Sequence, residues 1–213
     1  MIPASSPTLS ALLLLLTSYL LGSIPTSVWV GRLLFGIDIR TRGSGNAGGT
    51  NTLRVFGWRA AAPVVLVDVG KGALAAWLAT RVGAGIPSWL PVTCLAAAVL
   101  GHTFPVFARF RGGKGVATAA GGLCVLAPWA ALACAVLWLA VVGLTRIVSL
   151  ASVLAALVLP LTVVLLPGRR PAGLVPLALG LTLFVLWTHR SNLGRLARGE
   201  EPPLIAGRPP DGP

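Results

Sequence analysis

The chain has 213 residues, of which 55% are hydrophobic and only 10% are charged. A soluble domain usually has about 25% charged residues, so this composition excludes an ordinary water-soluble fold. The 17 basic residues against 5 acidic ones could suit a nucleic-acid-binding protein. Basic residues also gather in the cytoplasmic loops of membrane proteins, however, and the chain has several apolar runs of membrane-spanning length. We therefore predict an all-α, polytopic integral membrane helix bundle, a single domain over residues 1–213, with no nucleic-acid partner.

The apolar segments predict about seven transmembrane helices. In chain order they cover residues 9–30, 60–80, 89–107, 116–127, 129–144, 150–166 and 174–188. Gly22, Ser23 and Pro25 interrupt the first segment, and the two segments beside Pro128 are short. No basic residue precedes the first apolar run, so we interpret it as a retained span and not as a cleaved signal peptide.

The basic residues also predict an orientation. If the loop from Arg32 to Arg59 lies inside the cell, seven spans place thirteen basic residues inside and only three outside, namely Arg81, Arg169 and Arg170. This distribution follows the positive-inside rule, so we expect the N-terminus outside and the C-terminus in the cytoplasm. Four polar segments, at 32–59, 108–118, 145–149 and from His189 onward, then reach the same membrane face. We expect them to form one site there.

The first polar segment contains the run Arg40–Arg59, which reads RTRGSGNAGGTNTLRVFGWR and is rich in hydrogen-bond donors. Glycine lets backbone N–H groups approach a ligand closely, and hydroxyl, amide and guanidinium groups bind phosphate. No acidic residue occurs between Ile39 and Arg59. The run therefore predicts a site for a phosphorylated substrate. The run also matches GxGxxG at Gly43–Gly48. A dinucleotide site needs a preceding strand in a βαβ unit, which does not fit a membrane helix bundle, so we do not expect one.

The second polar segment is basic and rich in glycine, and it centres on Lys114 in ARFRGGKGVAT. A nucleotide-binding P-loop needs Ser or Thr directly after its lysine, and here Gly115 follows. We therefore expect no ATP chemistry. The cysteines are Cys94, Cys124 and Cys134, all in apolar runs without CxxC spacing, and they read as buried hydrophobic residues. With only two scattered histidines, no metal site is expected.

Several ionisable residues remain as candidates for function. His189 begins the motif HRSNLGRL and would share a helix face with Asn192. Its imidazole could accept a proton from an alcohol or donate to a phosphate. His102 is interpreted as a helix-end residue, with catalysis as the alternative. Asp68 and Lys71 lie three residues apart within a predicted span, where they form either a structural pair or part of a functional site.

Three motifs together resemble a known family. GSGNAGGTN, GHTFPVFARFRGGKGVAT and HRSNLGRL occur in the same order in the bacterial acyl-phosphate:glycerol-3-phosphate acyltransferases, the PlsY family, and VDVGKG at Val67–Gly72 extends the resemblance over most of the chain. Gly49 stands where the family usually has Ala, and Arg111 replaces a common Lys. The family transfers an acyl chain from acyl phosphate to the 1-hydroxyl of glycerol 3-phosphate, giving lysophosphatidic acid and phosphate without a cofactor.

The resemblance implies roles for the matching residues. It also implies a structural role for one of the two glutamates in the tail, Glu200 or Glu201. The sequence leaves open which glutamate this is. We expect basic side chains to offset the repulsion between the two substrate phosphates: Arg40, Arg42, Arg54 and Lys114. Catalytic roles are expected for Ser44, Arg54, His189 and Asn192. Substrate-binding roles are expected for Asn46, Thr50, Asn51, Gly112, Gly113, Lys114 and Ser149.

The resemblance also implies where the reaction takes place and what takes part in it. The expected partners are glycerol 3-phosphate, acyl phosphate and membrane lipid, and the protein is expected to be a monomer in the bacterial inner membrane with its active site on the cytoplasmic side. His189 is the first candidate for the proton acceptor, and a phosphate oxygen of the substrate is the second. A transporter for a phosphorylated solute would use the same donors. A transferase acting on a CDP-lipid would instead need a cluster of aspartates, and the three Asp here are scattered.

Overall fold

The computed structural model describes residues 7–81, 87–168 and 171–204, and this part of the chain contains helices and turns but no strands. Residues of the predicted outer loops at 82–86 and 169–170, and Arg208 in the tail, lie outside it. The helices are α1 (Pro7–Gly22), α2 (Thr26–Phe35), α3 (Gly49–Phe56), α4 (Trp58–Arg81), α5 (Leu90–Thr103), α6 (Val116–Leu126), α7 (Pro128–Thr145), α8 (Val148–Leu165), α9 (Leu174–Thr188) and α10 (Arg190–Ala197), with 3₁₀ turns η1 (Ile39–Thr41) and η2 (Val106–Ala108).

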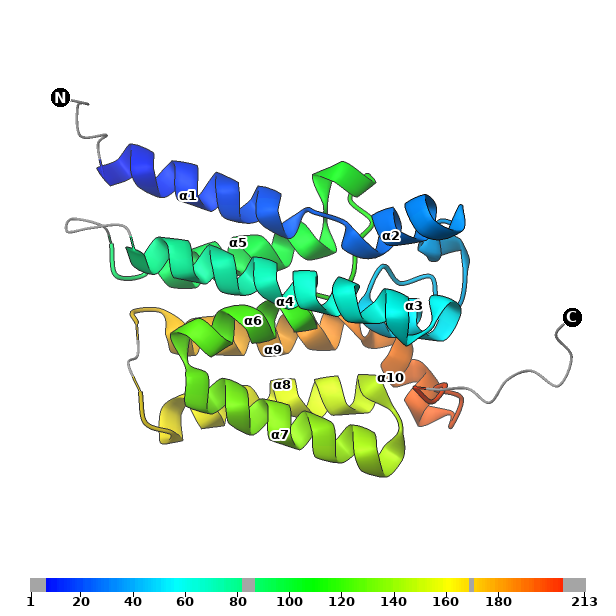
Figure 1. Ribbon diagram of the computed structural model, residues 1–213. Coiled ribbons are helices and arrows are strands. Elements are labelled where there is room, and N and C mark those ends of the chain that lie inside the picture. Colours follow the sequence, from blue (N-terminus) through cyan, green and yellow to red (C-terminus); the bar gives the residue numbers. More distant parts are fainter. Residues whose placement is uncertain (1–6, 82–86, 169–170, 205–213) are drawn as a thin grey trace, which may run out of the picture.

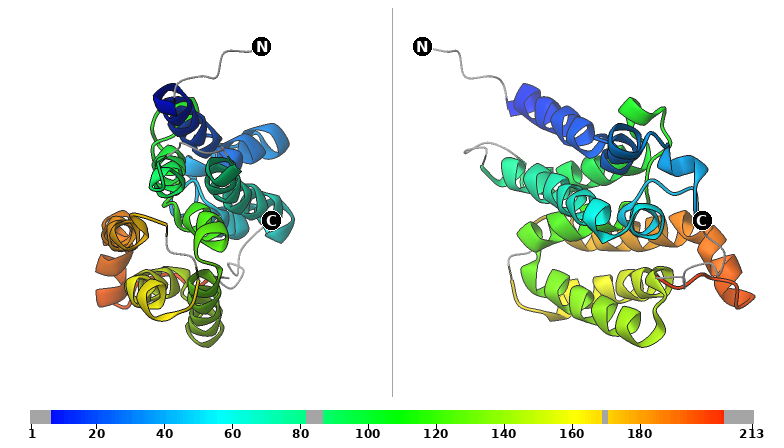
Figure 2. Two further views of the ribbon diagram at one scale, coloured as in Figure 1. Left: turned by 90° about the vertical axis from the view of Figure 1, so that its left-hand side faces the viewer. Right: turned by 45° about the vertical axis from the view of Figure 1, so that its right-hand side comes forward.

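The long helices lie side by side, and the chain direction alternates from one to the next (Figure 1). Helices α1, α4 and α5 form one half of the bundle and α7 and α8 the other, with α6 and α9 between them (Figures 1 and 2). Because of the alternation, the loop after α2, the loop before α6, the α7–α8 turn and α10 all reach one end of the bundle, the right-hand end in Figure 1. We call it the site end.

The all-helical membrane fold is confirmed, but the number of seven spans stays a prediction. Five helical segments of the described chain are long and apolar enough to cross a membrane, and α9 with α10 makes a sixth if this pair, bent by 61°, is counted as one span. Helix α6 has 11 residues, roughly 16 Å at 1.5 Å per residue. That is about half of the ~30 Å hydrocarbon thickness, so α6 alone crosses only part of a bilayer.

Two prolines explain where helices are separated. Pro128 begins α7, and the residue before a proline is disfavoured in the α region; Ala127 accordingly has φ −148° and ψ 68°, which ends α6. Pro25 similarly lies in the break between α1 and α2, directly before Thr26. The separation of the two short segments around Pro128 is therefore as predicted, and it lets the chain reverse direction between α6 and α7 (Figure 1).

Glycines allow the helices to pack closely. A Cβ on Gly72 would lie 1.9 Å from the Thr118 carbonyl oxygen, and one on Gly121 would lie 1.9 Å from the Val69 oxygen. Helices α4 and α6 therefore meet backbone to backbone, the small-residue packing typical of membrane helices. Large apolar side chains instead lie exposed on the outer surface, as lipid contact requires. They include Leu13, Leu66 and Leu183.

Candidate active site

Two cavities meet at the site end. The larger, about 470 Å³, runs between α4, α6, α7, α8 and α9 and is mostly apolar, and we call it the apolar cavity. The smaller, about 360 Å³, has mainly polar walls, and we call it the polar cavity. Four side chains line both and so mark the junction between them: Ser44, Asn46, Lys114 and Asn192.

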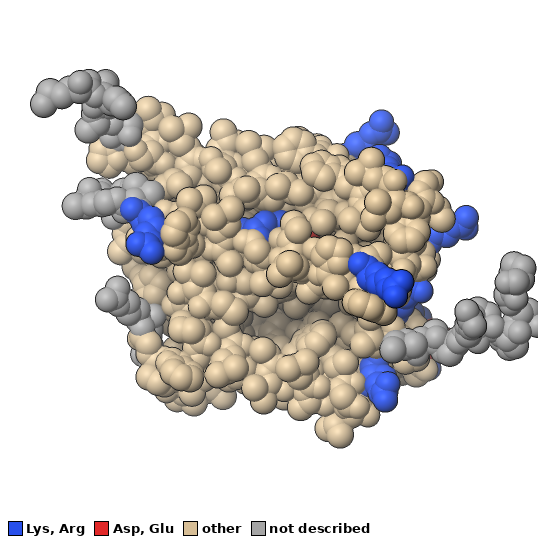
Figure 3. Space-filling model, in the orientation of Figure 1, with Lys and Arg blue, Asp and Glu red and all other residues tan. Residues whose placement is uncertain are grey.

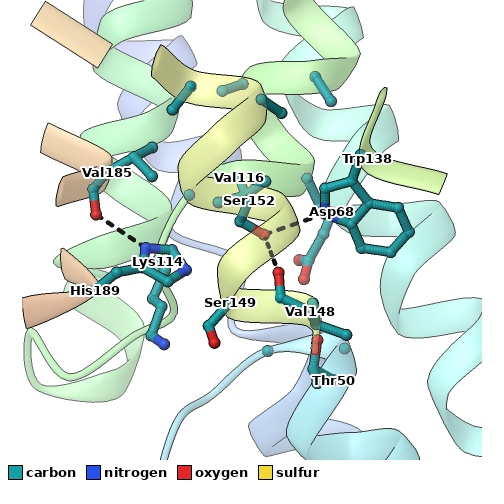
Figure 4. A pocket seen from close by; sticks show the side chains of 18 of the residues that line it. Thr50, Asp68, Lys114, Val116, Trp138, Val148, Ser149, Ser152, Val185 and His189 are labelled. Carbon is teal, nitrogen blue, oxygen red and sulfur yellow. Dashed lines mark hydrogen bonds between the residues drawn. The ribbon is translucent and has the colours of Figure 1, made fainter. Parts of the chain in front are cut away.

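The polar segments expected to form one site do converge. Nine of the predicted site residues line the apolar cavity: Ser44, Asn46, Thr50, Asn51, Arg54, Lys114, Ser149, His189 and Asn192. Gly112 and Gly113 line the polar cavity. Figure 4 shows Lys114 and His189 side by side, with Ser149 facing them. Figure 3 shows the hollow on one face of the bundle and basic side chains mainly at the site end.

Asn51 organises the first loop from within. Its buried side-chain amide donates to the carbonyl oxygens of Ile39, Arg42 and Asn46 at 3.0–3.2 Å, and its Oδ1 accepts from the Ser44 N–H at 2.9 Å. These contacts use the polar capacity of the amide. Asn51 therefore fixes the backbone that carries Ser44 and Asn46, and its expected substrate-binding role stays a prediction.

The Arg40 side chain makes contacts within and between the loops and lines neither cavity. Its guanidinium binds Asp38 through Nε and Nη2 at 2.9 and 2.7 Å and donates to the Ala108 carbonyl oxygen at 2.7 Å. The hydrogen bond from Arg40 holds the pKa of Asp38 well below its usual range. Neither Arg40 nor Arg42 lines the apolar or the polar cavity, and the expectation that both neutralise substrate phosphate stays a prediction. The run without acidic residues begins at Ile39, directly after Asp38, and Asp38 is the residue that binds Arg40.

The glycines of the second loop provide space, and their N–H groups are already used. Gly112 donates to the Thr103 carbonyl oxygen and Gly113 to the His102 carbonyl oxygen, both at 3.1 Å. A Cβ on Gly113 would lie 2.1 Å from His102 Nε2 and 2.8 Å from the Ala47 oxygen. Both N–H groups thus already have backbone acceptors, and the substrate-binding role expected for these glycines stays a prediction. They let the loop pass close to α5 and so place Lys114 at the junction.

Lys114 heads a chain of polar contacts that ends in the tail. Its ammonium donates to Asn192 Oδ1, whose Nδ2 donates to Glu201 Oε1 at 2.6 Å. Burial lowers the pKa of Lys114 to about 8, although the charge of Glu201 acts to raise it. An ammonium held in a half-buried cavity at this junction is suited to bind a phosphate.

Glu201 is the buried member of the glutamate pair, with 8% exposure. It accepts from Ser149 Oγ at 2.8 Å and from Arg195 Nε at 2.7 Å, as well as from Asn192. Burial raises the pKa of Glu201, but these three hydrogen bonds lower it below its usual value. The Ser149 hydroxyl therefore contacts the tail directly, and its expected substrate contact stays a prediction. Glu200, in contrast, lies exposed beside Arg198.

Arg54 joins the first loop to the same tail. It lines the apolar cavity and donates to the carbonyl oxygens of Pro202 and Pro203 at 2.8 and 3.2 Å. The Leu204 N–H also donates to the Arg146 carbonyl oxygen in the α7–α8 turn. The tail segment Glu201–Leu204 thus contacts α3, α8 and α10 at once, and it closes one side of the site.

His189 lies at the bend between α9 and α10 and has a defined orientation. Its Nδ1 is 2.9 Å from the Val185 carbonyl oxygen, which can only accept, so Nδ1 carries the proton in the neutral ring and Nε2 keeps a lone pair. No carboxylate near His189 in the sequence could orient its ring, and here the Val185 carbonyl does so (Figure 4). The ring is therefore equipped to accept a proton at Nε2.

Some lining residues were not predicted. Arg190, Ser191 and Arg195 line the polar cavity from α10, together with Arg111 and Thr103; three of them belong to the motif HRSNLGRL, so the motif was the available signal. Seven alanines on α6, α7 and α8 also line the apolar cavity, and in the sequence they look like any packed helix surface. Within the described residues, no group of three or more His, Cys, Asp or Glu could hold a metal ion.

Comparisons with known proteins agree with this architecture. The family model for glycerol-3-phosphate acyltransferase matches residues 12–199. A glycerol-3-phosphate acyltransferase of Parasynechococcus marenigrum is 48% identical over 92% of this chain and 91% of its own length, and one of Enterococcus faecalis is 44% identical over 92% of both chains.

Two solved structures are also similar. The crystal structure of PlsY, an integral membrane glycerol 3-phosphate acyltransferase, in its glycerol 3-phosphate form has a TM-score of 0.84 and 39% identity, covering 91% of this chain and 95% of that one. Its lysophosphatidic acid form has a TM-score of 0.81 and 38% identity over the same shares.

Proposed function

This chain belongs to the glycerol-3-phosphate acyltransferase family, and we propose that it transfers an acyl chain from acyl phosphate to the 1-hydroxyl of glycerol 3-phosphate, forming lysophosphatidic acid and phosphate. It is a multi-pass integral membrane protein. We place it in the bacterial inner membrane, with the site end toward the cytoplasm, because basic residues gather at that end. This reaction is the first acylation in phospholipid synthesis.

The observation that carries the proposal is the junction of two cavities of opposite character. The polar cavity, with Arg111, Arg190 and Arg195 in its wall, suits a small anion such as glycerol 3-phosphate. The apolar cavity suits a hydrocarbon chain, since each buried CH₂ contributes about 0.8 kcal/mol. An acyl phosphate placed in it would extend its phosphate toward Lys114 and Arg54. A transporter needs no such apolar chamber beside its anion site, so the two-cavity arrangement favours the transferase.

The reaction needs no further activation, because acyl phosphate is a mixed anhydride. The 1-hydroxyl oxygen of glycerol 3-phosphate attacks the acyl carbonyl carbon, and the tetrahedral intermediate then expels phosphate with the electrons of the broken C–O bond. Two phosphate groups must come close, and unit charges about 4 Å apart repel by roughly 1 kcal/mol in water and by more in a dry site. Lys114 at the junction would offset this repulsion and align the reactants.

The proton of the hydroxyl needs an acceptor. Nε2 of His189 is the candidate in the protein, because Val185 fixes the other ring nitrogen as the donor. The alternative acceptor is an oxygen of the departing phosphate. Inorganic phosphate carries at least one proton near neutral pH, so it must gain a proton whichever group accepts it first. The first turn of α3, at Gly49 and Thr50, lines the apolar cavity, and its backbone N–H groups lack intrahelical acceptors. We infer that these N–H groups and Ser44 donate hydrogen bonds to the oxygen of the acyl carbonyl group as its negative charge develops.

A direct assay tests the proposal. Purified protein in detergent, supplied with acyl phosphate and glycerol 3-phosphate and with no ATP, coenzyme A or metal, is expected to release phosphate and lysophosphatidic acid in equal amounts. Acyl-coenzyme A supplied in place of acyl phosphate serves as the donor control. Product formed from acyl-coenzyme A alone would contradict the proposed donor. Uptake of glycerol 3-phosphate into sealed vesicles without acyl transfer would favour the transporter instead.

A substitution deep in the apolar cavity should change the preferred acyl chain. Leu123, Ala131 and Leu159 are buried and line its inner part. Ala131→Phe is expected to exclude the end of long chains, so that the rate ratio between a 16-carbon and a 10-carbon donor falls at least tenfold, since each unburied CH₂ forfeits about 0.8 kcal/mol. Leu132→Phe is the control, because Leu132 is exposed on the same helix. An unchanged ratio in Ala131→Phe would place the chain elsewhere.

A further inference from the structure

A buried ionic network lies beside the junction, within the bundle. Asp68 and Lys71 are both at least 95% buried in α4, with Lys71 Nζ 2.9 Å from Asp68 Oδ1. Lys71 also donates to the Ile24 carbonyl oxygen at 3.1 Å, in the break between α1 and α2. The pair thus contacts the break on one side. Removing two charges from water is costly, so a pair kept here needs an explanation beyond helix packing.

On its other side, the pair contacts His102 of α5. His102 Nδ1 lies 3.5 Å from Asp68 Oδ1 and forms no hydrogen bond within the described chain. The ring is 93% buried, with 7% exposure, and both His102 and Asp68 line the apolar cavity. The Asp68 carboxylate is therefore placed to orient the imidazole ring electrostatically.

The far end of the ring supports the second loop. His102 Nε2 lies so close to Gly113 that an added Cβ would come within 2.1 Å of it, and the same Cβ would lie 2.8 Å from the Ala47 carbonyl oxygen. Gly113 is thus held between the His102 ring and the first loop. Asn46 and Lys114, the neighbours of Ala47 and Gly113, both line the junction. A rotation of the ring would therefore displace the residues that meet the substrate phosphate.

We propose that Asp68, Lys71 and His102 are positioning residues for the glycerol 3-phosphate site. The ion pair fixes the His102 ring, and the ring fixes the separation between the two phosphate-binding loops through Gly113. The proposal rests on the proposed function for the identity of the ligand. It assigns the network no proton transfer and no contact with the reacting atoms.

Shortening the ring tests the contact with the loop. His102→Asn keeps a donor near the position of Nδ1 but removes the end that meets Gly113. It is expected to raise the KM for glycerol 3-phosphate about tenfold or more, as displaced catalytic geometry does, with the KM for acyl phosphate and the thermal unfolding temperature nearly unchanged. Gly113→Ala should raise the same KM, because its methyl group collides with the ring. The double variant should be no worse than His102→Asn, because the shortened side chain admits the methyl group.

Neutralising the pair tests the role of the ionic network. Asp68→Asn with Lys71→Met leaves no unpaired buried charge, so this double variant is expected to fold and to raise the KM for glycerol 3-phosphate about as much as His102→Asn. Thr182→Val is the matched control, because it removes a buried hydrogen bond between α9 and the Ala156 carbonyl oxygen of α8. It should change the unfolding temperature without changing this KM.

The outcomes separate the inference from the function on which it rests. If wild-type protein forms no lysophosphatidic acid, the proposed function fails. If the wild-type protein is active while two variants, His102→Asn and the double variant Asp68→Asn with Lys71→Met, have the wild-type KM for glycerol 3-phosphate, the inference alone is wrong. Strictly additive effects of His102→Asn and Gly113→Ala would also overturn it, since the two positions would then act independently. Equal loss of all constants in every variant, Thr182→Val included, would show a purely structural network.

Discussion

Lys114→Ala is expected to lower kcat/KM for glycerol 3-phosphate by about 10²–10³-fold, the largest loss for any single side chain. The ammonium lies where the two cavities meet and contacts Asn192, and a charge-assisted hydrogen bond contributes about 1.5–3 kcal/mol, with further loss from an uncompensated phosphate. The measurement is steady-state kinetics with both substrates varied. Arg198→Ala is the control, because Arg198 is an exposed basic residue whose partner is Glu200. Equal losses in the two variants would contradict a phosphate role for Lys114.

The pH profile sharpens this prediction. The pKa of Lys114 is lowered to about 8, so its charged form predominates below pH 8 and is lost as the pH rises through that value. Because kcat/KM reports the free enzyme, kcat/KM for glycerol 3-phosphate should fall above pH about 8. In Lys114→Arg the guanidinium stays charged, so this alkaline decline should disappear even if the variant is slower. An unchanged decline would assign it to another group.

Glu201→Ala is expected to lower activity about 10²-fold and to destabilise the protein by roughly 3–5 kcal/mol, the cost typical of breaking a buried ionic contact. Three donors, from Ser149, Asn192 and Arg195, would lose their common acceptor. Asn192 would then be free to turn away from Lys114, and the tail that contacts Arg54 would lose its anchor. Thermal unfolding and kinetics on the same preparation measure both effects.

The neighbouring glutamate provides a matched control. Glu200 and Arg198 are each more than half exposed, and an exposed pair contributes only about 0–1 kcal/mol. Glu200→Ala should therefore leave activity and unfolding temperature nearly unchanged. If Glu200→Ala were as harmful as Glu201→Ala, the tail would act through its overall charge, and the buried cluster around Glu201 would not explain its effect.

The sequence predicted the helices and the convergence of the polar motifs well, because hydrophobic runs and charge placement follow directly from the properties of a lipid bilayer. It could not predict how the donors are used. Asn51 and Ser44 look alike in a glycine-rich loop, yet one is saturated by backbone carbonyls and the other lines both cavities. Nor did the sequence indicate that Asp38 binds the Arg40 guanidinium.

Contacts between distant segments were also beyond the sequence. Glu201 and Glu200 are adjacent and identical in type, and only the fold buries one of them against α8 and α10. The role proposed for the Asp68–Lys71 pair likewise depends on His102 from another helix. Spacing along the chain identifies which residues can share a helix face, but burial and partner choice arise from packing.

If the apolar cavity receives the acyl chain as proposed, its partly exposed lining gives the donor a route from the lipid. Val65 on α4 is 43% exposed and Leu139 on α7 is 63% exposed, and both line the cavity, which is visible as a hollow on the flank of the bundle (Figure 3). An acyl donor dissolved in the bilayer would thus enter the cavity laterally from the lipid without first entering water. Turnover should then follow the mole fraction of donor among the lipids, and diluting the vesicles in buffer should hardly slow it.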